Sequence, residues 1–270
     1  IAAETDYPPQ SQLIEGEPRL GTTRCQSTEY TANQLTGFDI EVAANIAGQL
    51  GVEPCFVTPG WSQIISGSWS DVWDVSVGSM VITPDRMKRL WFTQPYTSGS
   101  AVLFVHKDNQ SFHQPSDLSG KRVGVCAGCA YEDYLNGRLV IPGQQIVFKI
   151  HGAEIVGYDT DTSALADLAR GNGAHLDAVL TDPDTGEAEI ANGLPIKQMS
   201  EPVYYDFVAA AVDKKGISDP LPFLEKLNQI IQGMHADGTL SRLSVQYYGS
   251  DFTAQAADFD IQALYQEQKK

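Results

Sequence analysis

The spacing of apolar residues switches repeatedly between helical and strand periodicity from residue 36 onward. Apolar positions recur at helical spacing over 40–50, directly before Gly51, and over 222–248, where Gly238 interrupts the apolar face. Shorter helical stretches are predicted at 61–65, 131–135 and 161–169. Apolar runs typical of strands separate them, at 52–57, 72–77, 101–105, 122–125, 146–151, 177–180 and 207–212. This alternation predicts an α/β architecture with largely parallel sheets, whose ligands bind at the carboxyl ends of the strands.

The beginning of the chain has a different character. It opens at Ile1-Ala2-Ala3 without the basic and apolar stretches of a signal peptide. We interpret this start as processed or trimmed, which leaves a removed signal peptide or lipid anchor open. Residues 4–33 are rich in Pro, Gly, Ser, Thr and Gln and show little periodicity, so we predict a long loop before the first helix.

Length and composition restrict the class of protein. With 270 residues the chain forms either one large domain or two smaller ones, and 42% apolar residues are enough for a buried core. It contains no run of about 18 apolar residues that would cross a membrane. The formal charge of −16 repels a phosphate backbone, which disfavours nucleic acid as a partner. The acidity is typical of a soluble surface, and attraction of cationic solutes is the alternative that composition leaves open.

Four cysteines are present, at Cys25, Cys55, Cys126 and Cys129. The close pair Cys126-Ala127-Gly128-Cys129 follows a strand-like run, and the sequence offers no second Cys-x-x-Cys or suitably spaced histidines for a zinc site. We predict a structural disulfide for this pair, with free thiols and a catalytic redox pair as the alternatives. In an exported chain the even number of cysteines also permits a bridge between Cys25 and Cys55.

Charged residues follow two of the predicted strands. Arg86 closes the run 78–86 after the strand that ends near Val77, and its planar guanidinium matches a carboxylate. Asp182 ends the buried strand that begins at Asp177. An arginine and an aspartate at the mouths of two sheets would hold the two ends of a zwitterion. The ordinary alternative for Arg86 is a surface arginine after a turn.

We expect neither a metal nor a cofactor. The stretch 182–187 is superficially similar to a calcium loop, but its glycine comes one position early and Gly193 stands where the bidentate glutamate belongs. The histidines are scattered without the spacing of metal ligands, at His106, His113, His151, His175 and His235.

Seven short motifs follow one another in a fixed order over nearly the whole chain. The most specific is ITPDR at 82–86 followed by FTQPY at 92–96. The others are DYPP at 6–9, TGFDIE at 36–41, WSQII at 61–65, LSGKRVGV at 118–125, DAVLTD at 177–182 and ADGTL at 236–240. In this series the sequence resembles the bacterial solute-binding proteins of family 3, which are the polar amino-acid receptors of ABC transporters.

This resemblance implies a two-lobe periplasmic-binding-protein fold of type II, a Venus flytrap whose lobes are joined by two hinge strands. Lobe 1 would comprise 1–97 and 206–270, and lobe 2 would comprise 98–205. The implied function is a monomeric receptor, not an enzyme, that binds a free amino acid between the lobes and delivers it to the permease of an ABC importer. It would be periplasmic or extracellular, held at the cell surface only through a lipid anchor lost from this chain.

The resemblance also implies roles for individual residues. Arg86 would bind the α-carboxylate of the ligand, and Asp182, in the other lobe, would bind its α-ammonium. The ligand side chain would lie between Tyr7 and Trp61. Since an unpaired charge is costly to bury, a ligand that bridges the two lobes would favour the closed form. Backbone groups near four further residues would complete the carboxylate site: Ser79, Val81, Cys129 and Ala130.

The sequence departs from the family pattern at the carboxylate site and in one loop. Val81 stands where relatives often carry Ser or Thr, and Gly128-Cys129-Ala130 replaces their Gly-Thr-Thr or Gly-Ser-Thr. The site would therefore depend more on backbone N–H groups, and affinity for a standard α-amino acid would be weaker. The loop before Thr36 is longer than usual and contains Cys25, which we interpret as a lid-edge insertion pinned by a Cys25–Cys55 bridge.

The ligand class depends on Glu4. It occupies the position of an acid in relatives that bind lysine, arginine or glutamine. This favours a cationic amino acid, followed by glutamine or another polar neutral one. The alternatives are that Glu4 is a solvated loop acid, that Tyr7 packs within a loop and that Trp61 fills the core.

Two other functions on the same fold compete with a transport receptor. One is an exported enzyme similar to cyclohexadienyl dehydratase, with Glu132 or Glu4 as its acid, although neither has a positioned partner visible in the sequence. The other is a sensory ligand-binding domain, which requires an adjoining membrane segment. The sequence favours the receptor over both.

Overall fold

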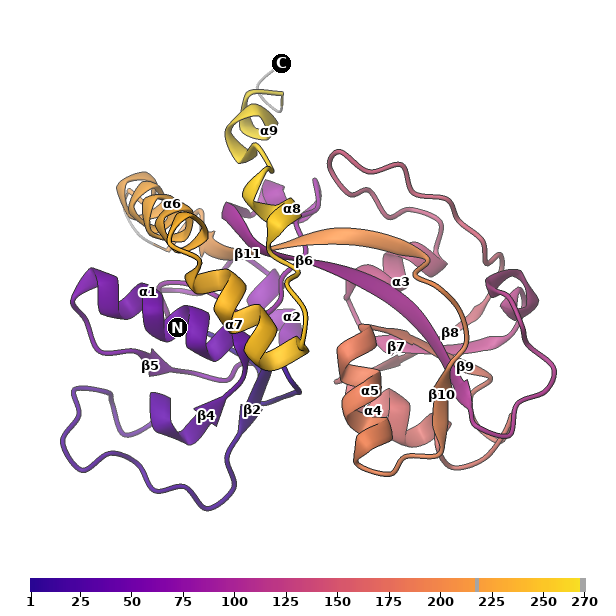
Figure 1. The fold of residues 1–270 in the computed structure, drawn as a ribbon. Coiled ribbons are helices and arrows are strands. Elements are labelled where there is room, and N and C mark those ends of the chain that lie inside the picture. The colour runs from indigo at the N-terminus through magenta and orange to yellow at the C-terminus, as the bar shows by residue number, and fades with distance from the viewer. Residues whose placement is uncertain (217–218, 268–270) are drawn as a thin grey trace. The chain divides into compact units, whose positions relative to one another are not determined.

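The protein consists of two compact units that are interleaved in sequence. The structure, a computed structural model, describes residues 1–216 and 219–267. Unit 1 is formed by Ile1–Ser98 and Phe207–Lys270, and unit 2 by Gly99–Asp206 (Figure 1). Each unit has strands and helices of its own.

Two long strands connect the units. β6 (Leu90–His106) leaves unit 1 after Ser98, and β11 (Tyr204–Asp213) enters it at Phe207. The two strands pair with each other, and both extend beyond the runs of apolar residues that predicted them. Any change in the relation between the units must therefore pass through the backbone of these two strands.

The core of unit 1 is packed with helices from both the N-terminal and the C-terminal part of the chain. Its first helix, α1 (Phe38–Leu50), ends at Gly51, whose φ of 72° supplies a left-handed C-cap. Before α1, a Cβ at Gly37 would lie 2.2 Å from the carbonyl oxygen of Gln10, so this close approach requires glycine. The other elements are β1 (Asp6–Tyr7), β2 (Ser11–Leu13), β3 (Tyr30–Thr31), η1 (Ala32–Gln34), β4 (Leu35–Thr36), β5 (Cys55–Phe56), α2 (Trp61–Ile65), η2 (Arg86–Lys88), α6 (Leu221–Ala236), α7 (Thr239–Tyr248), α8 (Ala254–Ala257) and α9 (Ile261–Glu267).

Strand pairing in unit 1 is made of short segments. β1, β2 and β4 form an antiparallel sheet in that order, and β3 pairs with β5. Residues 4–33, predicted as loop throughout, therefore include three short strands. The predicted strand at 72–77 is wrong in extent, because only Ser76 takes part in bridges, to Ala2 and to Ala211.

Unit 2 is built on a sheet with the strand order β10-β6-β9-β7-β8. β7 is parallel to β8 and β9, whereas β6 is antiparallel to β9 and β10. The sheet is mixed, so the prediction of largely parallel sheets is wrong. The elements of unit 2 are η3 (Pro115–Leu118), β7 (Arg122–Cys126), α3 (Ala130–Leu135), β8 (Glu154–Tyr158), α4 (Asp161–Leu168), β9 (Ala178–Thr181), α5 (Pro183–Ala191) and β10 (Ile196–Gln198).

The predicted strand at 146–151 is also wrong, since this segment is irregular and the strand lies further on, at β8. A side chain replaces the strand ladder here. The hydroxyl of Tyr134 donates to the carbonyl of Val147 at 3.2 Å and accepts from the N–H of Lys149 at 3.1 Å. The alternating apolar residues therefore pack without a neighbouring strand.

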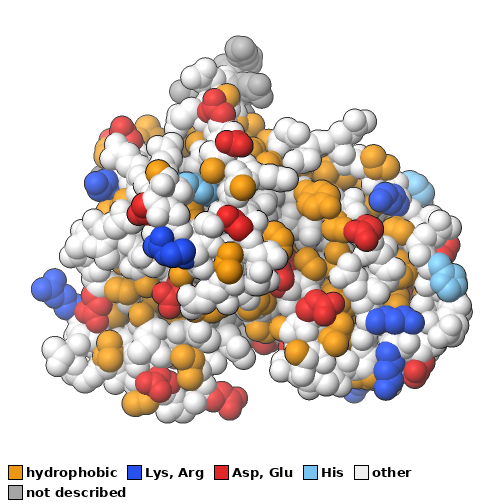
Figure 2. All heavy atoms as spheres, in the orientation of Figure 1, with side chains coloured by type: hydrophobic (Ala, Val, Ile, Leu, Met, Phe, Trp, Pro, Cys, Tyr) orange, Lys and Arg blue, Asp and Glu red, His pale blue; other side chains and the backbone are white. Residues whose placement is uncertain are grey.

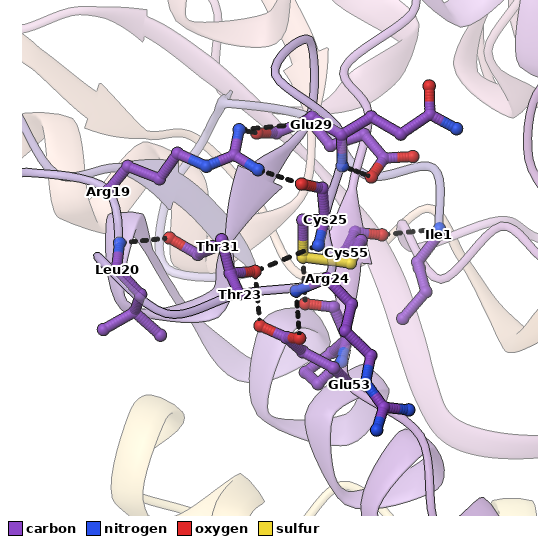
Figure 3. Close-up of a disulfide and its surroundings, with 12 residues drawn as sticks. Ile1, Arg19, Leu20, Thr23, Arg24, Cys25, Glu29, Thr31, Glu53 and Cys55 are labelled. Atoms are coloured by element: carbon purple, nitrogen blue, oxygen red, sulfur yellow. Dashed lines mark hydrogen bonds between the residues drawn. A yellow bond between two sulfur atoms is a disulfide. The ribbon is translucent and has the colours of Figure 1, made fainter.

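A disulfide between Cys25 and Cys55 fixes the long loop of unit 1, as the sequence permitted (Figure 3). The guanidinium of Arg19 donates to the carbonyls of Cys25, Gln26 and Glu29 beside it. The carboxylate of Glu53 accepts from the hydroxyl of Thr23 at 2.5 Å and from the N–H of Arg24 at 2.7 Å. Because these groups satisfy backbone groups of the loop, the stretch between β2 and β3 is held in place without regular secondary structure. Its place at the edge of a lid stays a prediction.

The surface retains the acidity of the sequence. Acidic side chains are spread over the face shown in Figure 2, and basic side chains are fewer there, in line with the net charge of −16. In the part of the chain that the structure describes, no helix combines the length and the apolar character needed to cross a bilayer. The excess of acidic side chains is thus carried at the surface of the folded protein.

The packing of α5 against β6 depends on Gly186. A Cβ at this position would lie 2.0 Å from Cζ of Phe104, a fully buried ring of the unit 2 core. We expect Gly186→Ala to lower the free energy of unfolding by about 2 kcal/mol in urea denaturation, because the ring has to move in a packed core. Gly233→Ala is the matched control, since it adds a methyl group to a helix with open space around it and should stabilise by about 0.5–1 kcal/mol. Equal effects of the two substitutions would contradict this account.

Candidate functional site

Three segments of unit 1 bring predicted site residues to one edge. Ala2 makes parallel bridges to both Val57 and Ser76, so all three segments run toward the same side. Residues that follow parallel strands meet at the carboxyl edge of a sheet. The predicted site residues that follow these segments are Glu4, Trp61, Ser79 and Val81.

Arg86 is buried, with only 6% of its surface exposed, so it is not a surface arginine after a turn. Its Nη1 donates to the carbonyl oxygen of Val81 at 2.9 Å. Its guanidinium carbon lies 5.1 Å from the centre of the Trp61 ring, within the range of a cation–π interaction. The structure therefore joins three of the predicted residues into one cluster around a buried cation.

The two aromatic residues predicted to enclose a ligand are both largely buried. Trp61 begins α2 and packs against Arg86, so it does more than fill the core. Tyr7 lies in β1, paired with Ser11 of β2. Each side chain belongs to unit 1, and Glu4, three residues before Tyr7, is half-buried. That Tyr7 and Trp61 hold a ligand side chain between them stays a prediction.

Ser79 adopts an unusual backbone conformation that two buried side chains maintain. Its φ is 47°, in the left-handed region that residues other than Gly, Asn and Asp rarely adopt. Its N–H donates to the hydroxyl of Tyr96 at 3.1 Å, and its own hydroxyl donates to Asp39 Oδ2 at 2.8 Å. The Tyr96 hydroxyl in turn donates to Asp39 Oδ1 at 2.9 Å. These three residues form a closed hydrogen-bonded network beneath the edge of unit 1.

Sequence reasoning missed Asp39 and Tyr96 as supports of the site, although both lie in the motifs at 36–41 and 92–96. Asp39 is fully buried in the first turn of α1, between the apolar neighbours Phe38 and Ile40. A carboxylate flanked by two core residues at the start of a helix was the available signal. Such an acid requires buried donors.

The second half of the predicted site lies at one edge of the unit 2 sheet. β7 and β9 are parallel neighbours, in register from Val123 with Ala178, so their carboxyl ends lie together. Cys129 follows β7 as the N-cap of α3, and Asp182 follows β9 as the N-cap of α5. The topology of the sheet thus brings Cys129, the adjoining Ala130 and Asp182 to the same edge.

Asp182 lies in an acidic setting. Its Oδ1 accepts from the backbone N–H groups of Asp184 at 2.9 Å and Thr185 at 3.3 Å, which caps α5. Burial, the charge of Asp184 and the charge of Asp206 together raise the pKa of Asp182 well above its ordinary value, in spite of these two donors. Burial and Glu187 raise the pKa of Asp184 to about 6. A cation placed here would relieve this repulsion.

Sequence reasoning did not assign Asp184 or Asp206 to the site. Asp184 lies in the stretch that was considered only as a calcium loop, and it is half-buried. Asp206 is 4% exposed at the start of β11. Its position beside Asp182 depends on strand pairing between distant parts of the chain, so the sequence carried no local signal for it.

Cys126 and Cys129 form a second disulfide, so neither is a free thiol. It spans the exposed turn of Ala127 and Gly128 between β7 and α3. Glu132, considered as an acid for an enzyme, accepts from the N–H of Gly128 at 2.8 Å. Its carboxylate therefore stabilises the turn that the disulfide closes.

The structure offers little for a metal ion. Among residues 1–216 and 219–267, Cys25, Glu29 and Cys55 are the one group of His, Cys, Asp or Glu side chains with suitable spacing. Both of its sulfur atoms belong to the disulfide in Figure 3, and a disulfide sulfur is not a thiolate ligand.

The chain is similar to known proteins in sequence and in structure. The family model described as bacterial extracellular solute-binding proteins, family 3, matches residues 21–250. The L-cystine-binding protein TcyJ of Escherichia coli (strain K12) is 28% identical over 221 residues, which cover 82% of this chain and 77% of the relative.

Solved structures are similar over nearly the whole chain. An ancestral arginine-binding protein bound to arginine has a TM-score of 0.73 at 28% identity, covering 92% of this chain and 96% of that one. The ancestral amino acid-binding protein AncCDT-1, described as a precursor of cyclohexadienyl dehydratase, has a TM-score of 0.70 at 25% identity, with 92% and 93% covered. This likeness confirms the predicted two-lobe α/β fold class.

The buried carboxyl of Asp39 makes stability depend on pH. Burial raises its pKa from an ordinary 3.8 to about 6, against the opposing effect of the Ser79 and Tyr96 hydrogen bonds. Between these values the folded protein binds more protons than the unfolded chain, so its stability falls as the pH rises from about 4 to about 6. At about 1.4 kcal/mol per pKa unit, the loss over the whole titration amounts to about 3 kcal/mol.

We therefore expect the unfolding free energy of the wild type, relative to that of Asp39→Asn, to fall by about 2 kcal/mol from pH 4 to pH 7, measured by urea denaturation. Asp85→Asn is the control with the opposite sign. Hydrogen bonding by Lys88 lowers the pKa of Asp85, so that carboxyl stabilises the fold more as the pH rises. A difference between wild type and Asp39→Asn that does not vary with pH would contradict the role of Asp39.

Proposed function

Because the chain belongs to the bacterial extracellular solute-binding proteins, family 3, we propose that it is a receptor for a free amino acid that it delivers to the permease of an ABC importer. Arg86 of unit 1 binds the α-carboxylate and Asp182 of unit 2 binds the α-ammonium. A zwitterion is complementary to both, so it binds most tightly when both units engage it. That difference in affinity drives closure of the two units on the ligand.

The burial of Arg86 carries the proposal. A buried guanidinium stabilises a protein only when its charge is met by electron-rich groups. The Val81 carbonyl and the face of Trp61 orient the planar fork at the edge where Ser79 also lies. An oriented fork offers bidentate hydrogen bonds to a carboxylate, and little side-chain freedom is lost when the ligand binds.

The acids of unit 2 favour the positive end of the ligand. Burial and mutual repulsion raise the pKa values of Asp182 and Asp184, and an ammonium group reverses this effect by stabilising the ionised carboxylates. Backbone N–H groups near Ser79, Val81, Cys129 and Ala130 complete the carboxylate site. Tyr7 and Trp61 enclose the side chain of the ligand.

The ligand is a cationic or polar amino acid, with the cationic class first. Two of the similar proteins are described as binding arginine and L-cystine, and both ligands are polar and carry more than one charged group. Glu4 follows the segment of unit 1 that bridges to Ser76, at the edge where Trp61 and Ser79 lie. An acid there pairs with a guanidinium or ammonium on the ligand side chain.

The receptor is periplasmic or extracellular and acts as a monomer at the cell surface. Its acidic surface disfavours nucleic acid (Figure 2). An enzyme on this fold is the weaker candidate, because Glu132 already accepts the Gly128 N–H at the start of α3. AncCDT-1 is itself described as an amino acid-binding protein, so this likeness also favours binding over catalysis.

Arg86→Ala tests the proposal directly. Calorimetry of the wild type against the common amino acids and L-cystine identifies the ligand. The variant should then bind that ligand at least about 100-fold more weakly, because the carboxylate loses its charged partner. Arg89→Ala is the matched control, since Arg89 forms an exposed pair with Asp85 at 2.9 Å and its loss should change affinity by about threefold at most. Near-normal affinity in a folded Arg86→Ala variant would overturn the assignment.

Glu4→Gln tests the ligand class. The substitution keeps the size of the side chain and removes its charge, so arginine and lysine should lose about tenfold in affinity while glutamine changes by less than about twofold. Isothermal titration with all three amino acids measures both effects. Equal losses for the three would show that Glu4 does not select for charge.

A further inference from the structure

The C-terminal part of unit 1 contains a segment that is hydrogen-bonded to β6 and contacts β11 at one residue. We call Asp251–Tyr265 the strap; it includes α8 and most of α9 and is yellow in Figure 1. The family model ends at residue 250, so the strap lies outside the region that defines the family. None of the roles assigned above requires it.

The strap is hydrogen-bonded to β6 up to the last residue of unit 1. The carbonyl of Phe252 accepts from the N–H of Ser98 at 2.9 Å and from its hydroxyl at 2.6 Å. Further along, the side chain of Gln94 donates to the carbonyl of Ala256 at 2.8 Å. Gln94 is itself held by Asn228 of α6, whose Oδ1 accepts its N–H at 2.6 Å. Ser98 is the residue at which β6 leaves unit 1.

The C-terminal end of the strap is also hydrogen-bonded to β6, through the side chain of Tyr265. The Tyr265 hydroxyl accepts from the N–H of Phe92 at 2.5 Å and donates to its carbonyl at 2.9 Å, which occupies both backbone groups of that residue. The Tyr265 ring meets Trp91 edge-on, with 5.2 Å between ring centres. A single side chain thus replaces a neighbouring strand at Phe92.

The strap contacts β11 at the point where that strand enters unit 1. The ring of Phe259 packs against Phe207, with 4.6 Å between ring centres. Phe207 is the first residue of unit 1 on β11. The strap therefore holds both connecting strands at the positions where they cross the boundary between the units.

The strap is also anchored to the body of unit 1, so it is not a loose tail. The Ser244 hydroxyl of α7 donates to the carbonyl of Ser250 at 2.8 Å and accepts from the N–H of Phe252 at 2.9 Å. Asp251 accepts from the hydroxyl of Ser241, also in α7, at 2.7 Å. Along the strap, Thr253, Ala256 and Ile261 are buried.

We propose that the strap is a hinge brace, which limits the bending of β6 and β11 at Ser98 and Phe207 and thereby sets how long the two units stay closed on a ligand. The proposal rests on the proposed function, because only a receptor that closes on its ligand needs a controlled hinge. A braced hinge samples fewer arrangements before the ligand binds, so less conformational entropy is lost on closure. The strap thus slows ligand release without contacting the ligand.

Phe259→Ala tests the brace at its contact with β11, and Phe223→Ala in α6 is its matched control. Both rings are half-buried in unit 1, but Phe223 packs on the core at α6. The dissociation rate of the ligand found by calorimetry is measured by stopped flow. Each protein is measured at the same number of degrees below its own melting temperature. We expect Phe259→Ala to release the ligand about tenfold faster, and Phe223→Ala to stay within about twofold of the wild type.

A second measurement needs no ligand. Probes introduced as non-natural amino acids at the exposed positions Val52 of unit 1 and Val147 of unit 2 report the distribution of distances between the units while the four cysteines stay intact. Phe259→Ala should broaden this distribution, and Phe223→Ala should not. An unchanged width with unchanged release, or equal changes in both variants, would overturn the brace. If the wild type binds no amino acid, the receptor proposal fails, and the width of the distribution alone decides the brace.

Discussion

A guanidinium ion that leaves water must recover its lost hydration from groups of the protein, and this requirement shapes the edge of unit 1. The carbonyl of Val81 and the face of Trp61 meet the charge of Arg86. Trp61 follows Val57 and Val81 follows Ser76, and both Val57 and Ser76 form parallel bridges with Ala2. The position of the cation therefore depends on this pairing. The core of unit 1 thus determines the direction in which its charge is presented.

The same edge is held from beneath by a second buried charge of opposite sign. Asp39 accepts hydrogen bonds from Ser79 and Tyr96, and these bonds maintain a backbone conformation at Ser79 that a serine would otherwise avoid. Strain at one residue is thereby balanced by hydrogen bonds of two others. An edge fixed in this way keeps its backbone in one arrangement, and under the proposed function this would lower the entropy lost when a ligand binds.

Much of the fold and part of the candidate site could be predicted from the sequence. The helices around 40–50 and 222–248 follow from strong periodicity, and the interruption at Gly238 follows from its left-handed conformation. The segment at 146–151 misled because the hydroxyl of Tyr134, and not a neighbouring strand, hydrogen-bonds to its backbone at Val147 and Lys149. A local sequence pattern does not show which group will hydrogen-bond to the backbone N–H and carbonyl groups. From the sequence alone, an irregular segment and a strand at 146–151 were therefore indistinguishable.

The candidate site residues also divide into those that a local motif predicts and those that only the tertiary structure brings together. Arg86 and Asp182 lie in contiguous motifs and were predicted, whereas Asp206 comes near Asp182 only through the assembly of the unit 2 sheet. The contacts of the strap with β6 join residues more than a hundred positions apart, such as Phe92 with Tyr265 and Gln94 with Ala256. Such contacts leave no periodicity in the sequence.

Asp182 caps α5 and, under the proposed function, also binds the ammonium group of the ligand, and this combination limits how the protein can evolve. Its Oδ1 caps the first turn of α5, so most replacements at this position would expose two backbone donors as well as remove a charge. Asn, Ser and Thr are the replacements that preserve the cap. If Asp182 binds the ligand as proposed, a variant of this protein that recognises an uncharged group there is confined to these few substitutions, so the cap of one helix restricts the change of ligand specificity.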